Sequence, residues 1–203
     1  MCTEVDEKLK EVKQSFRLMM DGAVAASMRS KGIDYHINWG ATLPRLRTKA
    51  DELGKDYGLA VALWKEDVRE CRLLATMVMP HEKMAADLAE LWMEQTRTIE
   101  EAEQLAFNLF QHLSFIPDLA FRWIASSETL PQICGYHVLS RLFMRGLQPN
   151  ERAVNEFVDQ AVAAMRDPSP TLRKAAHQSL QHFGNLSIMH RRLADSAMRI
   201  VIS

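Results

Sequence analysis

The sequence predicts an all-α fold built as a right-handed superhelix, or solenoid, of antiparallel helix pairs. Apolar residues recur with helical periodicity almost from one end of the 203-residue chain to the other. No segment alternates apolar and polar residues over the length of a strand. Short helices joined by short links cannot each bury both faces in a single layer, whereas stacked pairs can.

The first half of the chain contains clear helix boundaries around one long irregular segment, 31–43. Pro44 suits the first turn of a helix, and Gly54 suits its end, because proline lacks the N–H that a first turn leaves unpaired. We expect helices at about 3–20, 23–28, 44–54, 56–64, 66–77 and 81–95.

The second half begins with a capping-box pattern, in which Thr98 and Glu101 start a helix that runs to about Leu113. Pro117 and Pro131 are expected to punctuate two shorter helices. The remaining helices are expected at about 154–165, 170–184 and 186–201.

The helix pairs repeat about every 35 to 45 residues, which is the length of a HEAT repeat. We therefore expect one HEAT-like helical-repeat domain over residues 1–203, with a closed helical bundle as the alternative.

Composition restricts the functional classes. Hydrophobic residues make up 47% of the chain and charged residues 25%, as in ordinary globular proteins. Apolar stretches are short and interrupted by charges, so we expect neither a membrane span nor a signal peptide, and a cytoplasmic location. Cys2, Cys71 and Cys134 lie far apart, and no nucleotide-binding loop or metal-binding helix is present. We therefore expect free thiols, no metal and no cofactor.

The formal net charge of −1 conceals an asymmetry along the chain. Residues 81–103 include seven acidic and two basic side chains, whereas residues from Arg166 onward include six basic and two acidic ones. A basic region of this kind suits a polyanionic partner, although a solvated helix face needs no partner.

The segment Asn38 to Thr48 (NWGATLPRLRT) resembles the "G-V-x-x-P-x-L-R" entry motif of the bacterial DNA alkylation repair family, the AlkD-like HEAT-repeat glycosylases. Later landmarks occur in the same order: Leu63-Trp64, the run 69–75 (RECRLLA), Leu91-Trp92 and the run 172–176 (LRKAA). Each motif is weak alone, and their order over about 35–191 carries the resemblance to a divergent member.

The resemblance implies a basic concave surface around duplex DNA and hydrolysis of the glycosidic bond of N3- or N7-alkylated purines. An alkylated purine is already a cationic leaving group, so a carboxylate that stabilises the oxocarbenium-like sugar and places a water is the main requirement. Aromatic rings can hold the cationic nucleotide, and arginines can hold phosphates.

The family match assigns four site positions, and the sequence departs from the family at most of them. Glu103 aligns with the catalytic acid, one methylene longer, while Ile99 replaces an aromatic residue. Ile133 replaces a phosphate-gripping arginine, and Gln178 replaces a tryptophan. Because corresponding helices of a solenoid line one face, we expect these four residues to converge on one side. Glu103 can also be read as an ordinary solvated glutamate.

The DNA-backbone candidates are basic residues near Pro44 and in the C-terminal region: Arg45, Arg47, Arg173, Lys174, Arg191 and Arg192. We expect Arg45 and Arg47 to reach solvent at the start of a helix. His177, His182 and His190 share the basic region and could contact phosphate. Three functions remain open: an alkylpurine DNA glycosylase, a non-catalytic duplex DNA-binding relative, and a HEAT scaffold that binds a protein partner. The sequence leaves the oligomeric state open.

Overall fold

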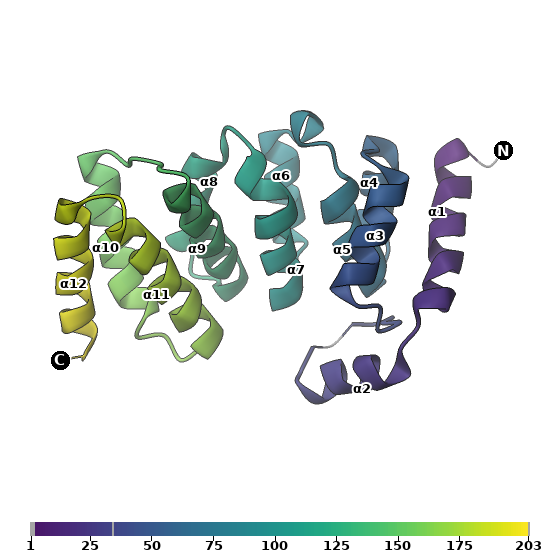
Figure 1. The fold of residues 1–203 in the computed structure, drawn as a ribbon, viewed down its shortest axis with the longest axis horizontal. Helices are drawn as coiled ribbons and strands as arrows, with labels where there is room; N and C mark the ends of the chain where they lie inside the picture. Colours follow the sequence, from purple (N-terminus) through teal and green to yellow (C-terminus); the bar gives the residue numbers. More distant parts are fainter. Residues whose placement is uncertain (1–2, 34, 203) are drawn as a thin grey trace. The chain divides into compact units, whose positions relative to one another are not determined.

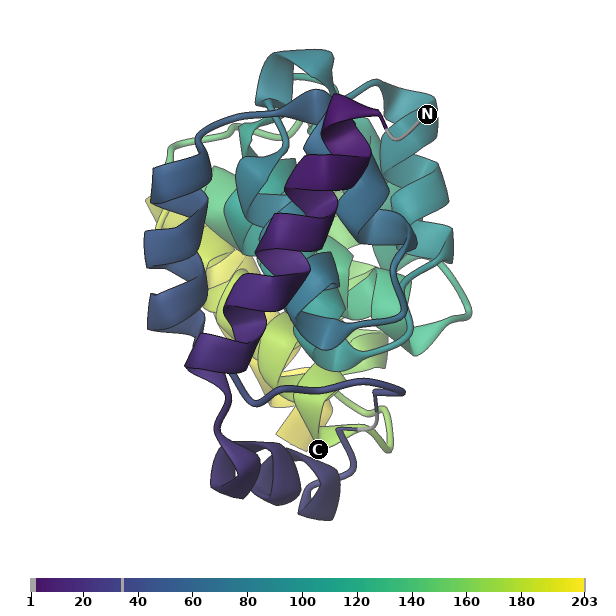
Figure 2. The same ribbon diagram turned by 90° about the vertical axis from the view of Figure 1, so that its right-hand side faces the viewer.

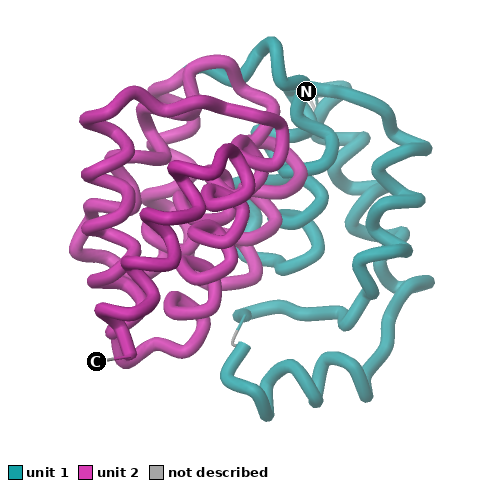
Figure 3. Tube along the Cα trace, turned by 60° about the vertical axis from the view of Figure 1, so that its left-hand side comes forward, with its two compact units in different colours: residues 1–85 teal, residues 86–203 magenta. Residues whose placement is uncertain are grey.

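The computed structural model describes residues 3–33 and 35–202, and over these residues the secondary structure is helical (Figure 1). The β-structure in these two ranges is a single isolated bridge between Ile37 and Val68, so the prediction of a fold without a sheet is confirmed for them. The chain divides into two compact units, Met1–Ala85 and Ala86–Ser203 (Figure 3). One domain over 1–203 remains a prediction.

Unit 1 begins with helix α1, which packs against α4, while α5 packs against both α3 and α4. Figure 2 looks onto α1 and shows α2 at one end of it. Side chains of Thr3, Asp21 and Asp56 accept hydrogen bonds from the first turns of α1, α2 and α4, as N-caps do. The elements are α1 Glu4–Ser15, η1 Phe16–Met19, α2 Gly22–Ser30, α3 Leu43–Leu53, α4 Tyr57–Lys65, α5 Arg69–Val78 and η2 His81–Lys83.

A buried ion pair fastens the segment before α3 to the start of α5. Arg69 and Glu70 are almost fully buried, with 3.1 Å between Arg69 Nη1 and Glu70 Oε1. Glu70 accepts hydrogen bonds from the backbone N–H groups of Trp39 and Ala41, and Arg69 donates to the carbonyl of Ala41. The motif that served as a landmark in the sequence therefore has a structural role, because it satisfies the backbone of the buried loop.

Gly40 allows this loop to approach α2 closely. Its φ of +77° is in the left-handed region that favours glycine. A Cβ atom at this position would lie 2.1 Å from the carbonyl oxygen of Asp21. Backbone packing against α2 therefore explains why glycine occupies position 40 in the segment Asn38 to Thr48.

Unit 2 is a series of neighbouring helices in which α9 occupies the centre. α9 packs against α7, α8 and α11, and α12 packs against α10 and α11. Its core contains stacked aromatic rings, including Phe143, Phe157 and Phe183 with ring centroids 5.0 to 5.5 Å apart. The elements are α6 Ala86–Glu94, α7 Ile99–Gln104, η3 Leu105–Leu109, η4 Phe110–His112, α8 Ile116–Ile124, α9 Thr129–Met144, α10 Glu151–Ala164, α11 Pro170–Gly184 and α12 Ile188–Ile202.

Three helix predictions need correction. The helix expected at 81–95 is broken, because Met84 adopts an extended conformation between η2 and α6. The helix expected from Thr98 to Leu113 changes from α7 into a π-helical turn, η3, and a 3₁₀ turn, η4. The helix marked by Pro131 is not short: α9 has 16 residues, because Pro131 lies in its first turn, where a missing N–H costs nothing.

Candidate nucleic-acid interface

Glu103 and His137 bring a carboxylate and an imidazole together on adjacent helices. Glu103 lies on α7, which begins where the Thr98 hydroxyl accepts a hydrogen bond from the backbone N–H of Glu101. The distance from Glu103 Oε1 to His137 Nε2 is 3.7 Å. The Glu103 side chain is 35% exposed and that of His137 is 11% exposed. The carboxylate therefore remains partly accessible to water or a ligand.

Phe107, on η3 directly after α7, lies beside this pair. Its ring meets the His137 ring edge to face, with centroids 4.9 Å apart. Cζ of Arg141 lies 5.0 Å from the centroid of Phe107, within the range of a cation–π contact. His137 and Arg141 are one turn apart on α9, so they share a face of that helix.

The π-helical turn η3 determines where Phe107 lies. A π-helix contains more residues per turn than an α-helix, so it rotates the following side chains relative to a regular helix. Phe107 is in the middle of this turn, beside α9. Such turns are rare and occur frequently at functional sites.

Ser140 and His182 continue the arrangement from α9 to α11. The distance from Ser140 Oγ to His182 Nδ1 is 2.6 Å. Burial lowers the pKa of His182 from its ordinary value of 6.5, and the positive charge of Arg141 lowers it further. We call the six residues on these helices the α7–α11 row: Glu103, Phe107, His137, Ser140, Arg141 and His182.

The four positions assigned by the family match lie on the same three helices but differ in accessibility. Ile99 is 40% exposed at the first residue of α7, and Gln178 is exposed on α11, one turn before His182. Ile133 on α9 is completely buried. Ile133 therefore cannot line a groove, and this assignment is corrected: its aliphatic side chain packs in the core. Whether Ile99, Glu103 and Gln178 act together remains a proposal.

The basic candidates are exposed, but some of them donate hydrogen bonds to nearby groups of the chain. Arg45 and Arg47 lie at the start of α3 and reach solvent, so that prediction is confirmed. In unit 2, Arg173 donates to the carbonyls of Asp167 and Pro168, and Arg191 donates to Asn185. The last two candidates, Lys174 and Arg192, are also exposed, and no hydrogen bond or ion pair holds their side chains within the described chain.

Sequence reasoning missed most of the α7–α11 row. His182 was among the histidines considered for phosphate contact, but Phe107, His137, Ser140 and Arg141 were not singled out. The His137–Arg141 spacing of four residues was a usable signal, since it places both side chains on one helix face. Phe107 gave no such signal, because its position depends on the π-helical turn.

The two cysteines in the described part of the chain both lie in the core. Cys71 and Cys134 are buried free thiols; burial raises the pKa of Cys71 to about 12 and raises the pKa of Cys134 further. Cys2 lies outside the described residues. No group of three or more His, Cys, Asp or Glu residues that could hold a metal occurs within 3–33 and 35–202. Among these residues no helix combines the length and apolar character needed to span a membrane.

Comparison with known proteins assigns the chain to a family. The model of the DNA alkylation repair enzyme family matches residues 12–187, and the chain belongs to that family. A search of curated proteins found no match.

The fold agrees with this assignment. A solved structure superposes with a TM-score of 0.81 over 95% of this chain and 83% of the other, at 14% sequence identity. It is described as a new family of proteins related to the HEAT-like repeat DNA glycosylases with affinity for branched DNA structures. The fold class is therefore the all-α HEAT-like repeat fold that the sequence predicts.

Proposed function

We propose that the chain is a DNA-binding member of the DNA alkylation repair enzyme family that holds the DNA backbone without excising a base. The observation that carries the proposal is the α7–α11 row, in which Arg141, His182 and the Phe107 ring occupy neighbouring positions on three packed elements. Guanidinium and imidazole groups bind phosphate oxygens, and an aromatic ring stacks on an unpaired base. The affinity of the solved relative for branched DNA supports DNA as the class of partner.

Exposed cations outside the row supply the sequence-independent part of binding. Lys174 on α11 and Arg192 on α12 are exposed and carry no competing ion pair within the described chain. Arg47, an exposed cation of unit 1, is a separate candidate. Each phosphate contact of this kind releases a counterion, so the affinity must fall as the salt concentration rises.

The residues at the family site argue against base excision. An aliphatic Ile99, an exposed Gln178 and a buried Ile133 provide neither an aromatic cradle nor a guanidinium for the flipped nucleotide. The negative charges of Glu100 and Glu103 repel phosphates, whereas Glu101 is buried.

A second candidate function rests on the accessibility of Glu103. A carboxylate that is 35% exposed can place a water next to a sugar, and a cationic N3- or N7-alkylated purine needs little further activation. In this case the Phe107 ring would supply the aromatic surface that Ile99 lacks.

The decisive experiment measures binding and excision with the same DNA. Fluorescence anisotropy with a plain duplex, a 7-methylguanine duplex and a three-way junction, each at two salt concentrations, gives the affinities and their salt dependence. We expect salt-dependent binding, and Arg141→Gln should lower the affinity and reduce the slope of log K against log salt by about 0.9. Arg122→Gln is the matched control, because Arg122 pairs with Glu90 on unit 2 outside the row.

The possible failures are distinct. No binding removes DNA as the partner and favours the alternative of a HEAT scaffold for a protein, whereas binding without salt dependence excludes the proposed phosphate contacts. Release of methylated purine that Glu103→Gln abolishes would establish the glycosylase and overturn binding without excision.

A further inference from the structure

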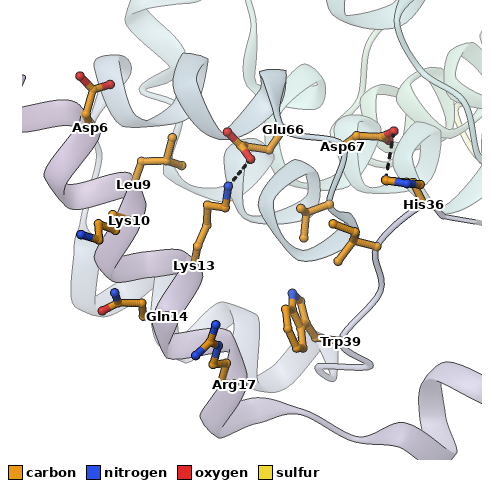
Figure 4. Close-up of a pocket in the computed structure, with 12 residues that line it drawn as sticks. Asp6, Leu9, Lys10, Lys13, Gln14, Arg17, His36, Trp39, Glu66 and Asp67 are labelled. Atoms are coloured by element: carbon orange, nitrogen blue, oxygen red, sulfur yellow. Dashed lines mark hydrogen bonds and ion pairs between the residues drawn. The ribbon is translucent and has the colours of Figure 1, made fainter. Parts of the chain in front are cut away.

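A cavity of about 470 Å³ lies in unit 1 (Figure 4). Its size is within the range of pockets that hold small molecules. α1 and η1 form one wall, and the segment after α2 together with the residues before α5 forms the other. Figure 4 shows Arg17 and Trp39 on opposite sides of the space.

Two large apolar side chains that line the cavity remain accessible to solvent. Ile37 is 39% exposed although it is aliphatic, and Trp39 is half-buried, whereas Trp64, Trp92 and Trp123 are buried. A large aromatic ring beside an exposed aliphatic side chain provides a surface on which a flat group can lie. The cavity therefore has an apolar contact surface that the fold itself does not cover.

Among the charged side chains that line the cavity, the acidic ones have partners in the described part of the chain, whereas two of the basic ones do not. The acidic groups are engaged: Glu66 lies 2.5 Å from Lys13, and Asp67 lies 3.9 Å from His36. Asp6 accepts hydrogen bonds from the backbone and hydroxyl of Thr3.

In contrast, the side chains of Lys10 and Arg17 have no hydrogen-bond or ion-pair partner within 3–33 and 35–202. The indole N–H of Trp39 has none there either. Both unpaired cations therefore lie on the wall formed by α1 and η1, and the indole N–H donor lies on the opposite wall.

We infer that this cavity binds a nucleotide phosphate, with Lys10 and Arg17 holding the phosphate and Trp39 and Ile37 contacting the base. A phosphate accepts hydrogen bonds from both cations, and a base supplies the flat apolar body that the ring and Ile37 fit. The same chemistry is found in a free nucleoside monophosphate and in the terminal nucleotide of a DNA strand. The second source rests on the proposed function, since a branched DNA presents such ends.

The test uses the tryptophan of the cavity as its reporter. Excitation at wavelengths absorbed by tryptophan but not by adenine follows a titration of the full chain with deoxyadenosine 5′-monophosphate at low salt. We expect a saturable change in emission that is absent in Trp39→Phe. The double variant Lys10→Gln/Arg17→Gln should weaken binding about tenfold or more, because each charge-assisted hydrogen bond contributes strongly. Arg29→Gln removes an exposed charge of α2 outside the cavity and should change nothing.

Two further ligands identify which parts of the nucleotide matter. Deoxyadenosine without phosphate should bind much more weakly. Inorganic phosphate that binds as well as the nucleotide would overturn the assignment, because the base would then contribute nothing. No saturable change with the nucleotide, or equal affinity in the double variant, would also overturn it.

A competition experiment with a DNA end distinguishes a free nucleotide from a strand terminus as the ligand. A duplex with a 5′-phosphorylated single-stranded flap should compete with the nucleotide for the cavity if a strand end is the ligand, whereas competition by the free nucleotide alone assigns the cavity to a small molecule. Failure here is separable from failure of the proposed function. Duplex binding that depends on Arg141 and not on Lys10 or Arg17 leaves DNA binding intact without this cavity.

Discussion

Glu103 Oε1 lies 3.7 Å from Nε2 of His137, a ring nitrogen for which the described chain provides no hydrogen-bond partner. The pair joins α7 to α9 at the side chain that the family match assigns to catalysis. If the chain binds DNA without excision, removing the Glu103 carboxylate should raise the affinity for DNA. If the chain is a glycosylase, removing it should abolish the release of methylated purine.

Glu103→Gln keeps the shape of the side chain and removes its charge. If the chain binds DNA without excision, affinity for the duplex should rise about threefold, because one repulsive charge beside the phosphates is lost. Anisotropy titrations of the two proteins at the same salt concentration measure this change. An unchanged or lower affinity would mean that Glu103 does not face the DNA backbone as proposed.

Arg141→Gln should raise the pKa of His182 toward 6.5. Burial is the larger cause of the depressed pKa and remains, so the recovery is partial, and only the repulsion from Arg141 is removed. NMR titration of the His182 ring in the two proteins tests this. Arg122→Gln serves again as the control, and an equal shift in that variant would contradict a specific effect of Arg141.

The same group makes stability depend on pH. Because the folded chain holds the pKa of His182 below 6.5, the unfolded chain binds this proton more readily. The contribution of neutral His182 to stability is fully present above pH 6.5 and decreases as the pH falls below it. Urea unfolding of the wild type and of His182→Gln at pH 7.5 and pH 5.5 should show a smaller loss on acidification in the variant.

Gly40→Ala should destabilise the protein by about 3 kcal/mol or more, since a positive φ and a backbone clash act together. Gly32→Ala is a matched control, because Gly32 has the same φ of +77° but no atom within 4 Å of the added Cβ. It should cost only about 1 kcal/mol. Urea unfolding gives both values, and equal losses would show that the approach to Asp21 does not determine the preference for glycine.

Glu70→Gln tests the ion pair that fastens the loop to α5. Removing one charge of a buried pair leaves the other uncompensated, so we expect a loss of about 3 to 5 kcal/mol in the free energy of unfolding. Glu4→Gln removes a carboxylate from an exposed pair with Lys8 and should cost less than about 1 kcal/mol. Similar losses in the two variants would exclude burial as the source of the effect.

The sequence predicted the fold well because the evidence for it is local. Helical periodicity, the cap at Thr98, and Pro44 followed by exposed arginines each depend on residues within one turn. The break at Met84 was missed because the apolar spacing continues through it. Periodicity records which residues face the core but not whether the backbone between them is continuous.

The candidate site was predicted only in part, for a different reason. Placing Glu103 on α7 required only the helix, whereas its contact with His137 depends on how α7 packs against α9. Ile133 aligned with a functional arginine, yet its burial is a property of the packed unit. Pairwise packing between helices distant in sequence leaves no periodic signature in either one.

The π-helical turn at Leu105–Leu109 has a consequence for comparing this chain with its relatives. A relative with an uninterrupted α-helix here would need one residue fewer to cover the same length. Its counterpart of Phe107 would then be found one place earlier in an alignment without gaps, and a conserved ring could pass unnoticed. Superposition of backbones, with a single-residue gap allowed inside the helix, is the comparison that would recover it.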